Sequence, residues 1–451
     1  MKTTIALPSY RNRYVNFLFR QLHQIFSGGL PALHRKLVRF LFALWAIPAV
    51  LLMRCLRPWR TIRLACISFI HQEAIGHFVV DTAIHWAMRQ QARQPNQYLD
   101  LYYFESPQEV SQEILEAAWP AQKVCNDFWA KMVRRNFLVS PWFLVKPVEY
   151  WNRKLPGGAV HHLPMPLEVT GSLDIHGWIE KAQVNMPFLP EEDEQAKTWL
   201  RCQGWQEGEP FVCLQVRDGS YKGTQGLQGQ ISARNSDIAN YDIAARWLAE
   251  QGVWVLRMGK NMAKPMPTSH PRIIDYAFHP ERSDFLDIWL FAHCDFCIST
   301  GSGPDIVSSV YRRPLLILNY TMPEVPYLWS NAMHLLKPLV WKASGTPLAF
   351  REYLEHNWWS QGRDSTYYDR AGIQLLELPP EQILTAVQEQ WQRMQGIWVD
   401  TEADRDRHHC FWQILKHHPN FIKSTTGMTW MHPECRASTT WLRSMGDIFL
   451  T

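Results

Sequence analysis

From Thr61 onward, short aliphatic runs alternate with longer segments in which apolar residues recur every three or four positions. Short unbroken apolar runs predict buried strands, and the longer periodicity predicts amphipathic helices. The strands expected on this basis are 62–69, 98–104, 211–216, 253–257, 272–275, 296–298 and 315–318. The helices expected with them are 73–91, 108–118, 124–134, 194–202, 237–251 and 380–395. Alternation at this spacing predicts an α/β fold with doubly wound, largely parallel sheets.

Breaks in this pattern divide the chain into four regions. At 451 residues it is long enough for two domains with separate cores. The proline-containing, acidic stretch Pro187–Glu194 is a suitable linker between them. We therefore expect a basic, apolar helical segment over residues 1–60, a Rossmann-like domain over 61–190, a second Rossmann-like domain over 205–400, and a helical tail over 401–451 that packs back on the first domain.

The N-terminal segment differs from the rest in charge. The first 72 residues carry eleven Lys/Arg and no acid, whereas the remainder carries 35 basic and 42 acidic residues. Phe40–Met53 is uncharged, but it is shorter than the roughly 20 residues that span a bilayer, and Pro48 interrupts it. We expect residues 1–60 to bind an anionic membrane surface as an interfacial or re-entrant anchor. The alternative is a helical hairpin packed on the body of the protein, or a partner-binding helix.

The basic residues expected to meet acidic headgroups are Arg20, Arg35, Lys36, Arg57 and Arg60.

The segment Phe285–Tyr320 is expected to form a helix, a strand, a glycine turn, a second helix and a second strand. The turn is Gly301-Ser302-Gly303-Pro304, and Pro304 and Asp305 both suit the first turn of a helix. Backbone N–H groups at such a junction point into one space and favour an anion there. A plain tight connection is the alternative interpretation of this turn.

Basic residues follow two further predicted strands. Arg217 comes directly after 211–216, and Arg257 and Lys260 flank Gly259 after the next strand. The carboxyl ends of parallel strands are where phosphates are bound, and a guanidinium can hold a diphosphate through two hydrogen bonds. The loop after Arg217 adds Tyr221, Lys222, Arg234 and Asn235. Convergence of these groups predicts a phosphate site, while a surface ion pair between Arg217 and Asp218 is the alternative.

Several other functions are disfavoured. A dinucleotide fingerprint needs a third glycine where Ile306 stands, and no Walker A, H-E-x-x-H or G-x-S-x-G pattern occurs. Cys294 and Cys297 form a C-x-x-C inside an apolar run, which predicts core packing. The histidine clusters near 408 and 417 lack paired zinc spacing. Nucleic acid is not expected, because the basic residues lie beside a long apolar run.

The order of several motifs resembles a known family. They are Arg217-Asp218 with Tyr221, Arg234-Asn235-Ser236-Asp237-Ile238, Asn240-Tyr241, Arg257-Met258-Gly259-Lys260, Asp275-Tyr276, Thr300-Gly301-Ser302-Gly303, Gly372-Ile373 and Pro380-Glu381-Gln382-Ile383. Together they resemble bacterial glycosyltransferases found with surface-polysaccharide genes. The resemblance covers about 205–415 and extends loosely to Ile75-Gly76-His77.

This resemblance implies a GT-B architecture, with the acceptor in the first domain and a nucleotide-sugar donor in the second. The donor-binding residues it implies are Arg217, Tyr221, Lys222, Arg234, Asn235, Arg257, Gly259, Lys260, Asp275, Tyr276, Thr300, Gly301, Ser302, Gly303 and Asp305. The strand end at Arg217 is also similar to that of GT-B fucosyltransferases, whose arginine holds the donor diphosphate. Their second arginine and preceding histidine are missing here, so the donor sugar stays open.

Two groups are expected to catalyse the transfer. Arg217, with the Ser302 and Gly303 amides and Lys260, would stabilise charge on the leaving phosphates without a metal. His77 is the first candidate for the base that activates the acceptor, ahead of Asp81 and Glu73, although a lone histidine is more often structural.

The sequence thus predicts a metal-independent glycosyltransferase without a cofactor, cytoplasmic and peripheral to the inner membrane. Its expected partners are a nucleotide-sugar donor and a lipid-linked or surface-glycan acceptor. The alternatives are a nucleotide-sugar epimerase and a non-catalytic, membrane-tethered nucleotide- or glycan-binding module.

Overall fold

The computed structural model describes residues 29, 37, 41, 44–68, 74–91, 97–105, 124–222, 233–321, 328–356 and 365–451. The predicted helix 108–118, Glu73 and most of the segment 1–43 therefore lie outside the described residues, as do the side chains of Tyr221 and Lys222. The described chain forms two compact units. The first unit comprises 44–67, 97–105 and 137–164, and nearly all the other described residues belong to the second.

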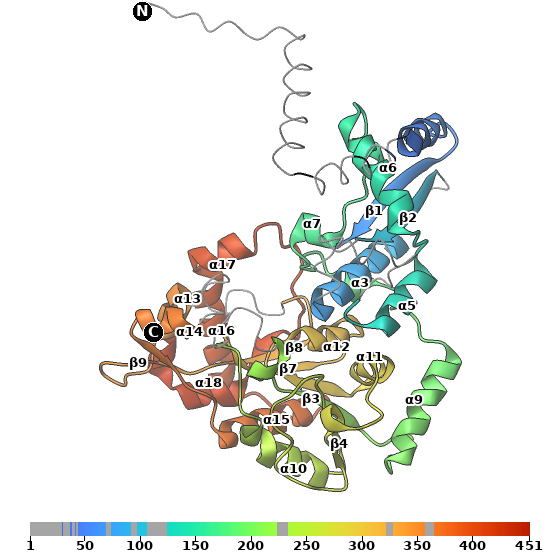
Figure 1. Cartoon of the computed structure of the whole chain (residues 1–451). Helices are drawn as coiled ribbons and strands as arrows, with labels where there is room; N and C mark the ends of the chain where they lie inside the picture. Colours follow the sequence, from blue (N-terminus) through green and yellow to red (C-terminus); the bar gives the residue numbers. More distant parts are fainter. Residues whose placement is uncertain are drawn as a thin grey trace, which may run out of the picture. The chain divides into compact units, whose positions relative to one another are not determined.

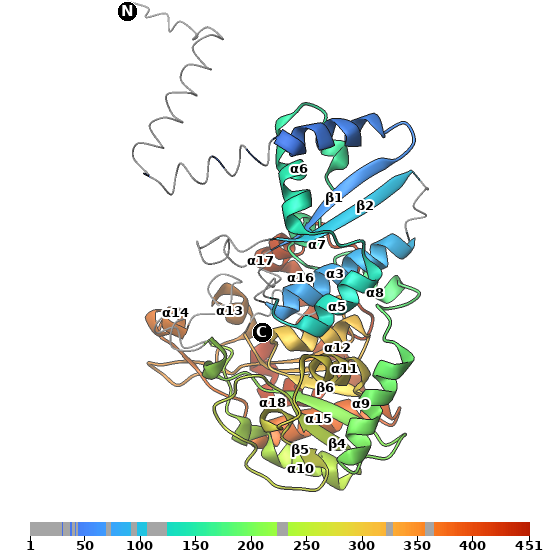
Figure 2. The same ribbon diagram turned by 45° about the vertical axis from the view of Figure 1, so that its right-hand side comes forward.

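The first unit is built on two parallel strands, β1 (Thr61–Ile67) and β2 (Tyr98–Phe104). Isolated parallel bridges from Leu64 to His162 and from Tyr102 to Val139 add one short segment beside each strand. A helix over residues 44–55 and α6 (Trp142–Lys154) pack on these strands (Figures 1 and 2). The core contains Val50, Tyr103 and Val148, and so joins both helices to the strands.

The second unit contains a seven-stranded parallel sheet with the order β5-β4-β3-β6-β7-β8-β11. Its strands are β3 (Phe211–Gln215), β4 (Trp254–Arg257), β5 (Ile273–Ile274), β6 (Phe296–Ser299), β7 (Leu315–Tyr320), β8 (Ala332–Leu336) and β11 (Arg436–Ala437). Every residue of β3, β4, β6, β7 and β8 is buried. Such continuous burial is expected when helices cover both faces of a parallel sheet.

Helices lie on both faces of this sheet. α10 (Asp242–Glu250) and α15 (Pro380–Met394) contact each other and cover one face, while α11 (Asp284–His293) and α12 (Ile306–Val310) cover the other (Figure 2). α3 (Ile75–Gln91) packs on α12, and α5 (Asp127–Asn136) packs on α11.

The remaining helices are α7 (Pro166–Thr170), α8 (Trp178–Lys181), α9 (Pro190–Cys202), α13 (Phe350–His356), α14 (Ser365–Arg370), α16 (Glu402–His417), α17 (Pro419–Ser424) and α18 (Thr439–Met445). A small antiparallel pair joins β9 (Leu339–Trp341) to β10 (Ile373–Leu375). Among the described residues, no helix is both long and apolar enough to cross a bilayer.

The predicted α/β class, with Rossmann-like parallel sheets, is confirmed. The order of the first six strands is the doubly wound one, in which the chain builds β3, β4 and β5 outward and then returns to the other side of β3. Cys294 and Cys297 are fully buried, as core packing requires. The units do not follow the expected domain limits, because α3, α5 and residues 165–190 cluster with the second unit.

The C-terminal tail completes the large sheet. β11 pairs with β8, with Arg436 opposite Met333. Trp430 of the same tail lies against Gly177, where a Cβ atom would stand 2.4 Å from the indole ring. The tail that we expected to pack on residues 61–190 therefore contacts part of that range and also forms the seventh strand of the C-terminal sheet.

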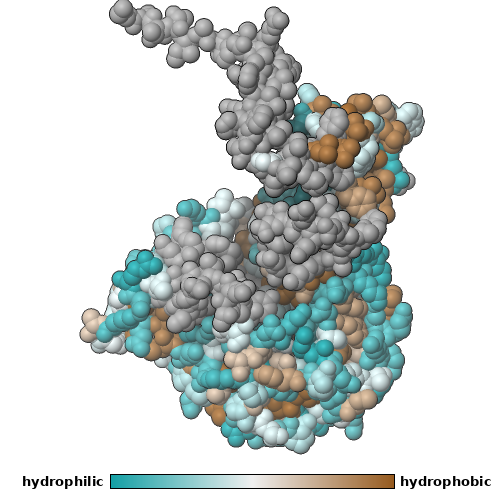
Figure 3. Space-filling model, in the orientation of Figure 1, coloured by the Kyte–Doolittle hydropathy of each residue, from teal (hydrophilic) through white to brown (hydrophobic). Residues whose placement is uncertain are grey.

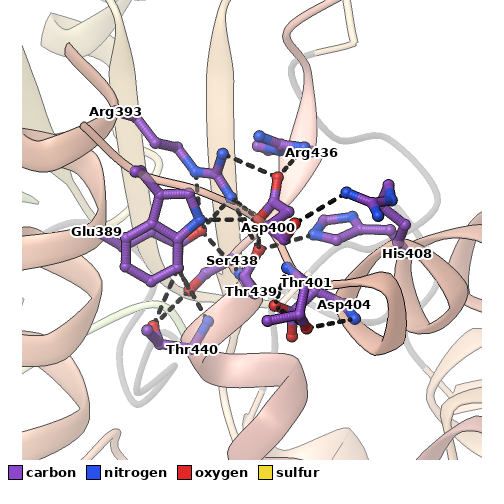
Figure 4. Close-up of polar contacts among 12 residues, drawn as sticks. Glu389, Arg393, Asp400, Thr401, Asp404, His408, Arg436, Ser438, Thr439 and Thr440 are labelled. Atoms are coloured by element: carbon purple, nitrogen blue, oxygen red, sulfur yellow. Dashed lines mark hydrogen bonds and ion pairs between the residues drawn. The ribbon is translucent and has the colours of Figure 1, made fainter. Parts of the chain in front are cut away.

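A buried polar network holds the tail in place (Figure 4). The Glu389 carboxylate is fully buried and accepts hydrogen bonds from the backbone N–H groups of Thr439 and Thr440, at 3.0 and 2.9 Å. Ser438 Oγ and Arg393 Nε also donate to it, at 2.7 and 3.0 Å. An anion at the first turn of α18 is favourable because unpaired N–H groups and the positive end of the helix dipole meet there.

His408 adds a pH dependence to this network. Its Nε2 lies 3.2 Å from Thr439 Oγ1, and burial lowers the pKa of His408 to about 4, below the roughly 6.5 of an unfolded histidine. Between these two values the unfolded chain binds one more proton than the folded chain. The free energy of unfolding therefore falls as the pH falls through this window.

Between about pH 7 and pH 4, the free energy of unfolding should fall by about 3 kcal/mol less in His408→Gln than in the wild type. Urea denaturation at several pH values measures this difference. His334, whose pKa burial also lowers to about 4, retains its own share of the loss in this variant. His417→Gln, on the exposed side of the same helix, is the matched control and should keep the wild-type slope. Equal slopes in all three proteins would contradict the assignment to His408.

Candidate functional site

The strand order reverses between β3 and β6, and the candidate site lies at their carboxyl ends. Thr300 N, just after β6, donates to Gln215 O at the end of β3, at 3.2 Å. Arg217 N donates in turn to Thr300 Oγ1 at 3.1 Å, so Arg217 begins directly above the junction of the two strands. Open α/β sheets bind ligands at this reversal point. The strand end before Arg217 and the strand end before the glycine turn therefore lie side by side and are hydrogen-bonded to each other.

The glycine turn has a conformation that needs glycine. Gly301 has a φ of 71°, and a Cβ atom there would stand 2.7 Å from the ring of Tyr320. Asp305 is fully buried below the turn and accepts from Ser299 Oγ at 2.5 Å and from Ser302 N at 2.8 Å. Asp305 therefore shapes the turn, and the Ser302 amide, expected to face a phosphate, is already bound to this carboxylate.

Arg234 and Asn235 reach the same turn from the loop after Arg217. Arg234 Nη1 donates to Gly301 O at 2.8 Å. Lys337, directly after β8, holds this loop through Nζ hydrogen bonds to Ala233 O at 3.1 Å and Asn235 O at 2.7 Å. Lys337 is buried, and burial lowers the pKa of its ammonium group. The structure thus places the side chains of Arg234 and Lys337, and the backbone of Arg217, close to the turn.

Lys337 and Gln215 were not identified from the sequence. Lys337 follows the apolar run Leu335-Leu336, and a charge at the end of a buried strand is the signal that could have found it. Gln215 is buried at the end of β3, and its Oε1 accepts no hydrogen bond from the described residues. A buried carbonyl oxygen without a donor costs free energy, so this amide is suited to a hydrogen-bond donor on a ligand.

The N-terminus of α3 lies against the turn from the other side. A Cβ atom on Gly76 would stand 2.9 Å from Gly303 Cα and 3.2 Å from Gly303 O. The two backbones are therefore in direct contact, which places His77 of α3 beside the turn. His77 Nδ1 lies 3.1 Å from Ser172 Oγ, and Ser172 has a φ of 68°, which is unusual for a residue with a side chain. This backbone conformation of Ser172 places its hydroxyl group at hydrogen-bond distance from the His77 imidazole.

The other candidate bases are placed differently. Asp81 is fully buried, and its Oδ2 accepts from Leu167 N at 3.1 Å, so this carboxylate fixes the start of α7. Glu73 lies outside the described residues. Of the three candidates, His77 is the one that the described structure brings to the turn.

The remaining predicted donor residues form a second group around the loop after β4. Arg257 is almost fully buried and pairs with Asp275 Oδ1 at 3.1 Å, while its Nη2 donates to Lys264 O at 2.8 Å. Tyr276 is buried, and its hydroxyl contacts the Ser283 backbone. Lys260 Nζ lies 3.3 Å from Asp284 Oδ1. These contacts pair Arg257 with a carboxylate directly after β5, and Lys260 with a carboxylate at the start of α11.

This second group also contains Gly259, whose φ is 152° and whose Cβ atom would meet the Met262 side chain at 2.5 Å. Asp218 connects the two groups, because its Oδ2 accepts from Ala263 N at 2.7 Å and its Oδ1 from Ser220 N at 3.0 Å. Within the described residues, no group of three or more His, Cys, Asp or Glu side chains is arranged to hold a metal ion. Metal independence stays a prediction.

No family model and no curated protein matches the sequence. Among solved structures, a glycosyltransferase family 9 protein from Veillonella parvula aligns with a TM-score of 0.36 and 12% identity, over 61% of this chain and 86% of the other. ADP-heptose LPS heptosyltransferase II from E. coli aligns with a TM-score of 0.33 and 13% identity, over 57% and 84%.

A UDP-N-acetylglucosamine 2-epimerase from Listeria monocytogenes aligns with a TM-score of 0.26 and 8% identity, over 57% of this chain and 79% of the other. At these identities and TM-scores, none of the three assigns an activity or a ligand to this chain.

The backbone contact at Gly76 gives a test of the site's geometry. Gly76→Ala should lower the free energy of unfolding by about 1–3 kcal/mol, because the new methyl group overlaps the Gly303 backbone. Gly219→Ala is the matched control, since its Cβ atom meets only Asn235 Nδ2, at 3.4 Å. Chemical denaturation measures both variants. If Gly76→Ala were as stable as Gly219→Ala, α3 would not lie in contact with the turn.

Proposed function

We propose that this chain is a GT-B glycosyltransferase that moves a sugar from a nucleotide-sugar donor to a lipid-linked or surface-glycan acceptor. One observation carries the proposal. Arg217 N donates to Thr300 Oγ1, directly before the Gly301–Gly303 turn, at the reversal point of a Rossmann-like sheet. This is the position at which such sheets bind the phosphates of a nucleotide.

Charge supports a diphosphate ligand at this point. Arg234 and Lys337 lie close to the turn, Arg217 begins beside it, and Asp305 below it is already bound to Ser299 and Ser302. When the bond between sugar and diphosphate breaks, negative charge develops on the leaving phosphates. Fixed cations stabilise that charge without needing to reorganise. The side chain of Arg217 is the group proposed to bind the diphosphate directly.

His77 is the proposed base for the acceptor hydroxyl. Its helix contacts the turn through Gly76, and Ser172 Oγ lies at hydrogen-bond distance from its Nδ1. A neutral imidazole takes up a proton near neutral pH, as activation of a sugar or lipid hydroxyl requires. Ser172 is then a positioning residue, because it acts on the orientation of the imidazole ring.

The acceptor is proposed to lie at the cytoplasmic face of the inner membrane. The support is the composition of the first 72 residues, which carry eleven basic residues and no acid around a long apolar run. An epimerase or a binding module would use the same phosphate site, so the three functions differ in what happens to the sugar. Transfer to an acceptor supports the proposal, epimerisation supports the epimerase, and binding without turnover supports the module.

Thermal unfolding with UDP, GDP, CMP or ADP tests the phosphate site. One nucleotide should stabilise the protein by about 2.7 kcal/mol at a hundredfold excess over its Kd. Arg217→Ala should raise the Kd of this nucleotide at least about tenfold, because a charge-assisted contact is lost. Arg246→Ala, at an exposed i,i+4 pair on α10, is the control and should bind like the wild type. If no nucleotide raised the unfolding temperature, the phosphate site would be disproved.

Turnover of the matching nucleotide sugar tests His77. His77→Ala should lower kcat about 10²–10⁴-fold while leaving nucleotide binding within about twofold. Ser172→Ala should have a smaller effect on kcat and should move the pH profile, because the ring loses the hydrogen bond between Nδ1 and Ser172 Oγ. A His77→Ala enzyme with wild-type kcat would exclude this histidine as the base.

A further inference from the structure

The helix over residues 44–55 is apolar on all sides, although one side faces outward. Ala46, Val50 and Met53 are buried in the core of the first unit. Leu44, Ile47, Leu51 and Leu52 lie on the opposite side of the helix and are exposed, Leu52 to 63%. A helix at a water-facing surface normally has a polar outer side, and a helix that is apolar all round is normally covered.

The helix over residues 44–55 is packed against α6, which also has exposed apolar side chains. Both helices belong to one core cluster through Val50, Val145 and Val148. Arg54 fastens them together, because its Nε lies 3.2 Å from Asn152 Oδ1 and its Nη1 donates to Pro156 O at 2.8 Å. α6 exposes Leu144 and Tyr150 in addition.

Exposed large apolar side chains are concentrated in this unit. Of the 23 such side chains in the described part of the chain, 13 belong to the first unit, including Leu56 and Trp59, which is 76% exposed. Figure 3 shows brown, apolar surface on the part of the first unit that is visible in this view. We call the face formed by Leu44, Ile47, Leu51, Leu52, Leu144 and Tyr150 the 44–150 face.

Basic residues outnumber acidic ones in the described part of the first unit. The described part of the first unit contains seven Lys/Arg and three acids. Two of the acids are buried and paired, Asp100 with Arg63 at 2.7 Å and Glu149 with Arg153 at 2.6 Å. The third, Glu105, lies 3.9 Å from Lys146. Arg60, Arg153 and Lys154 are exposed.

Not every basic residue of this region is offered outward. Arg57, expected to meet headgroups, donates instead from Nη2 to Gly157 O at 2.7 Å, and its Nε lies 2.7 Å from His161 Nε2. Arg54 and Arg57 therefore hold the helix to the end of α6. The exposed basic residues that remain are Arg60, directly before β1, and Arg153 and Lys154 on α6. Arg60 was expected to meet headgroups, whereas α6 lies outside the segment 1–60 that the sequence connected with a membrane.

We propose that the 44–150 face docks on an anionic lipid bilayer, with the outward leucines and Tyr150 in the interface and the α6 cations at the headgroups. Apolar side chains gain free energy on leaving water, and each cation near an anionic surface adds about 1 kcal/mol. The proposal extends the membrane location suggested above to a defined surface that includes α6. It rests on that location, but its test needs no turnover.

Co-sedimentation of the full chain with vesicles tests this surface. The vesicles contain equal parts of phosphatidylglycerol and phosphatidylcholine, and vesicles of phosphatidylcholine alone serve as the neutral reference. Leu51→Glu with Leu52→Glu should lower the vesicle partition coefficient at least about tenfold. Leu144→Glu with Tyr150→Glu, on α6, should have an effect of the same size. Higher salt should weaken binding to the anionic vesicles.

Ile397→Glu with Val399→Glu is the matched control, because both side chains are exposed in the second unit. It should bind vesicles like the wild type. All variants should unfold at nearly the wild-type temperature, because every altered side chain is at least 46% exposed. The nucleotide-induced stabilisation should also persist in each variant, so that failure of docking and failure of the phosphate site remain distinguishable.

Three results would overturn the proposal. Wild-type partitioning by the α6 variant would show that other residues hold the chain on the membrane. Equal binding to neutral and anionic vesicles would show that the face does not require anionic lipid. A chain that ignores vesicles but forms a dimer, dispersed to monomers by Leu51→Glu with Leu52→Glu in light scattering, would show that a second copy covers the face.

Discussion

The approach of two backbones at Gly76 and Gly303 is the constraint on which the candidate site depends. Neither position has room for a side chain, because a Cβ atom on either would reach the other's backbone. The contact brings the first turn of α3 to the end of β6, and so joins an early segment of the chain to the glycine turn that lies more than 200 residues later. His77 is placed beside the turn by this steric condition, and Ser172 then fixes its ring.

The cations near the sheet divide into those committed to carboxylates and those gathered at the turn. Arg257 and Lys260 face Asp275 and Asp284, so their charges are largely compensated. Lys337 is held by backbone carbonyls, which carry no net charge, and Arg234 binds the carbonyl of Gly301. Lys337 also feels the charge of the Glu377 carboxylate, and Asp305 is buried at the turn itself. The described contacts therefore place Arg234 and Lys337 on backbone carbonyls near the reversal point, whereas Arg257 and Lys260 are paired with carboxylates.

The sequence allowed β3 to β7 and the position of the glycine turn after β6 to be predicted, because apolar runs and glycine positions report directly on backbone conformation. The role of Arg257 could not be predicted, because its direction depends on Asp275, which lies on a neighbouring strand end. Lys337 was missed for the same reason, since its partners are carbonyls about 100 residues earlier in the chain. The grouping of α3 with the second unit likewise depends on packing at Gly303, which no local pattern contains.

The seventh strand has a consequence for synthesis of the protein. β11 pairs with β8 although about 100 residues separate them, and α18 is anchored directly behind it by Glu389. While the ribosome is still producing the residues in between, the outer edge of β8 has no neighbouring strand. Unpaired edges of this kind invite intermolecular pairing. During synthesis, β8 is therefore the segment that a molecular chaperone would have to shield. The need for shielding ends when β11 has been synthesised and pairs with β8.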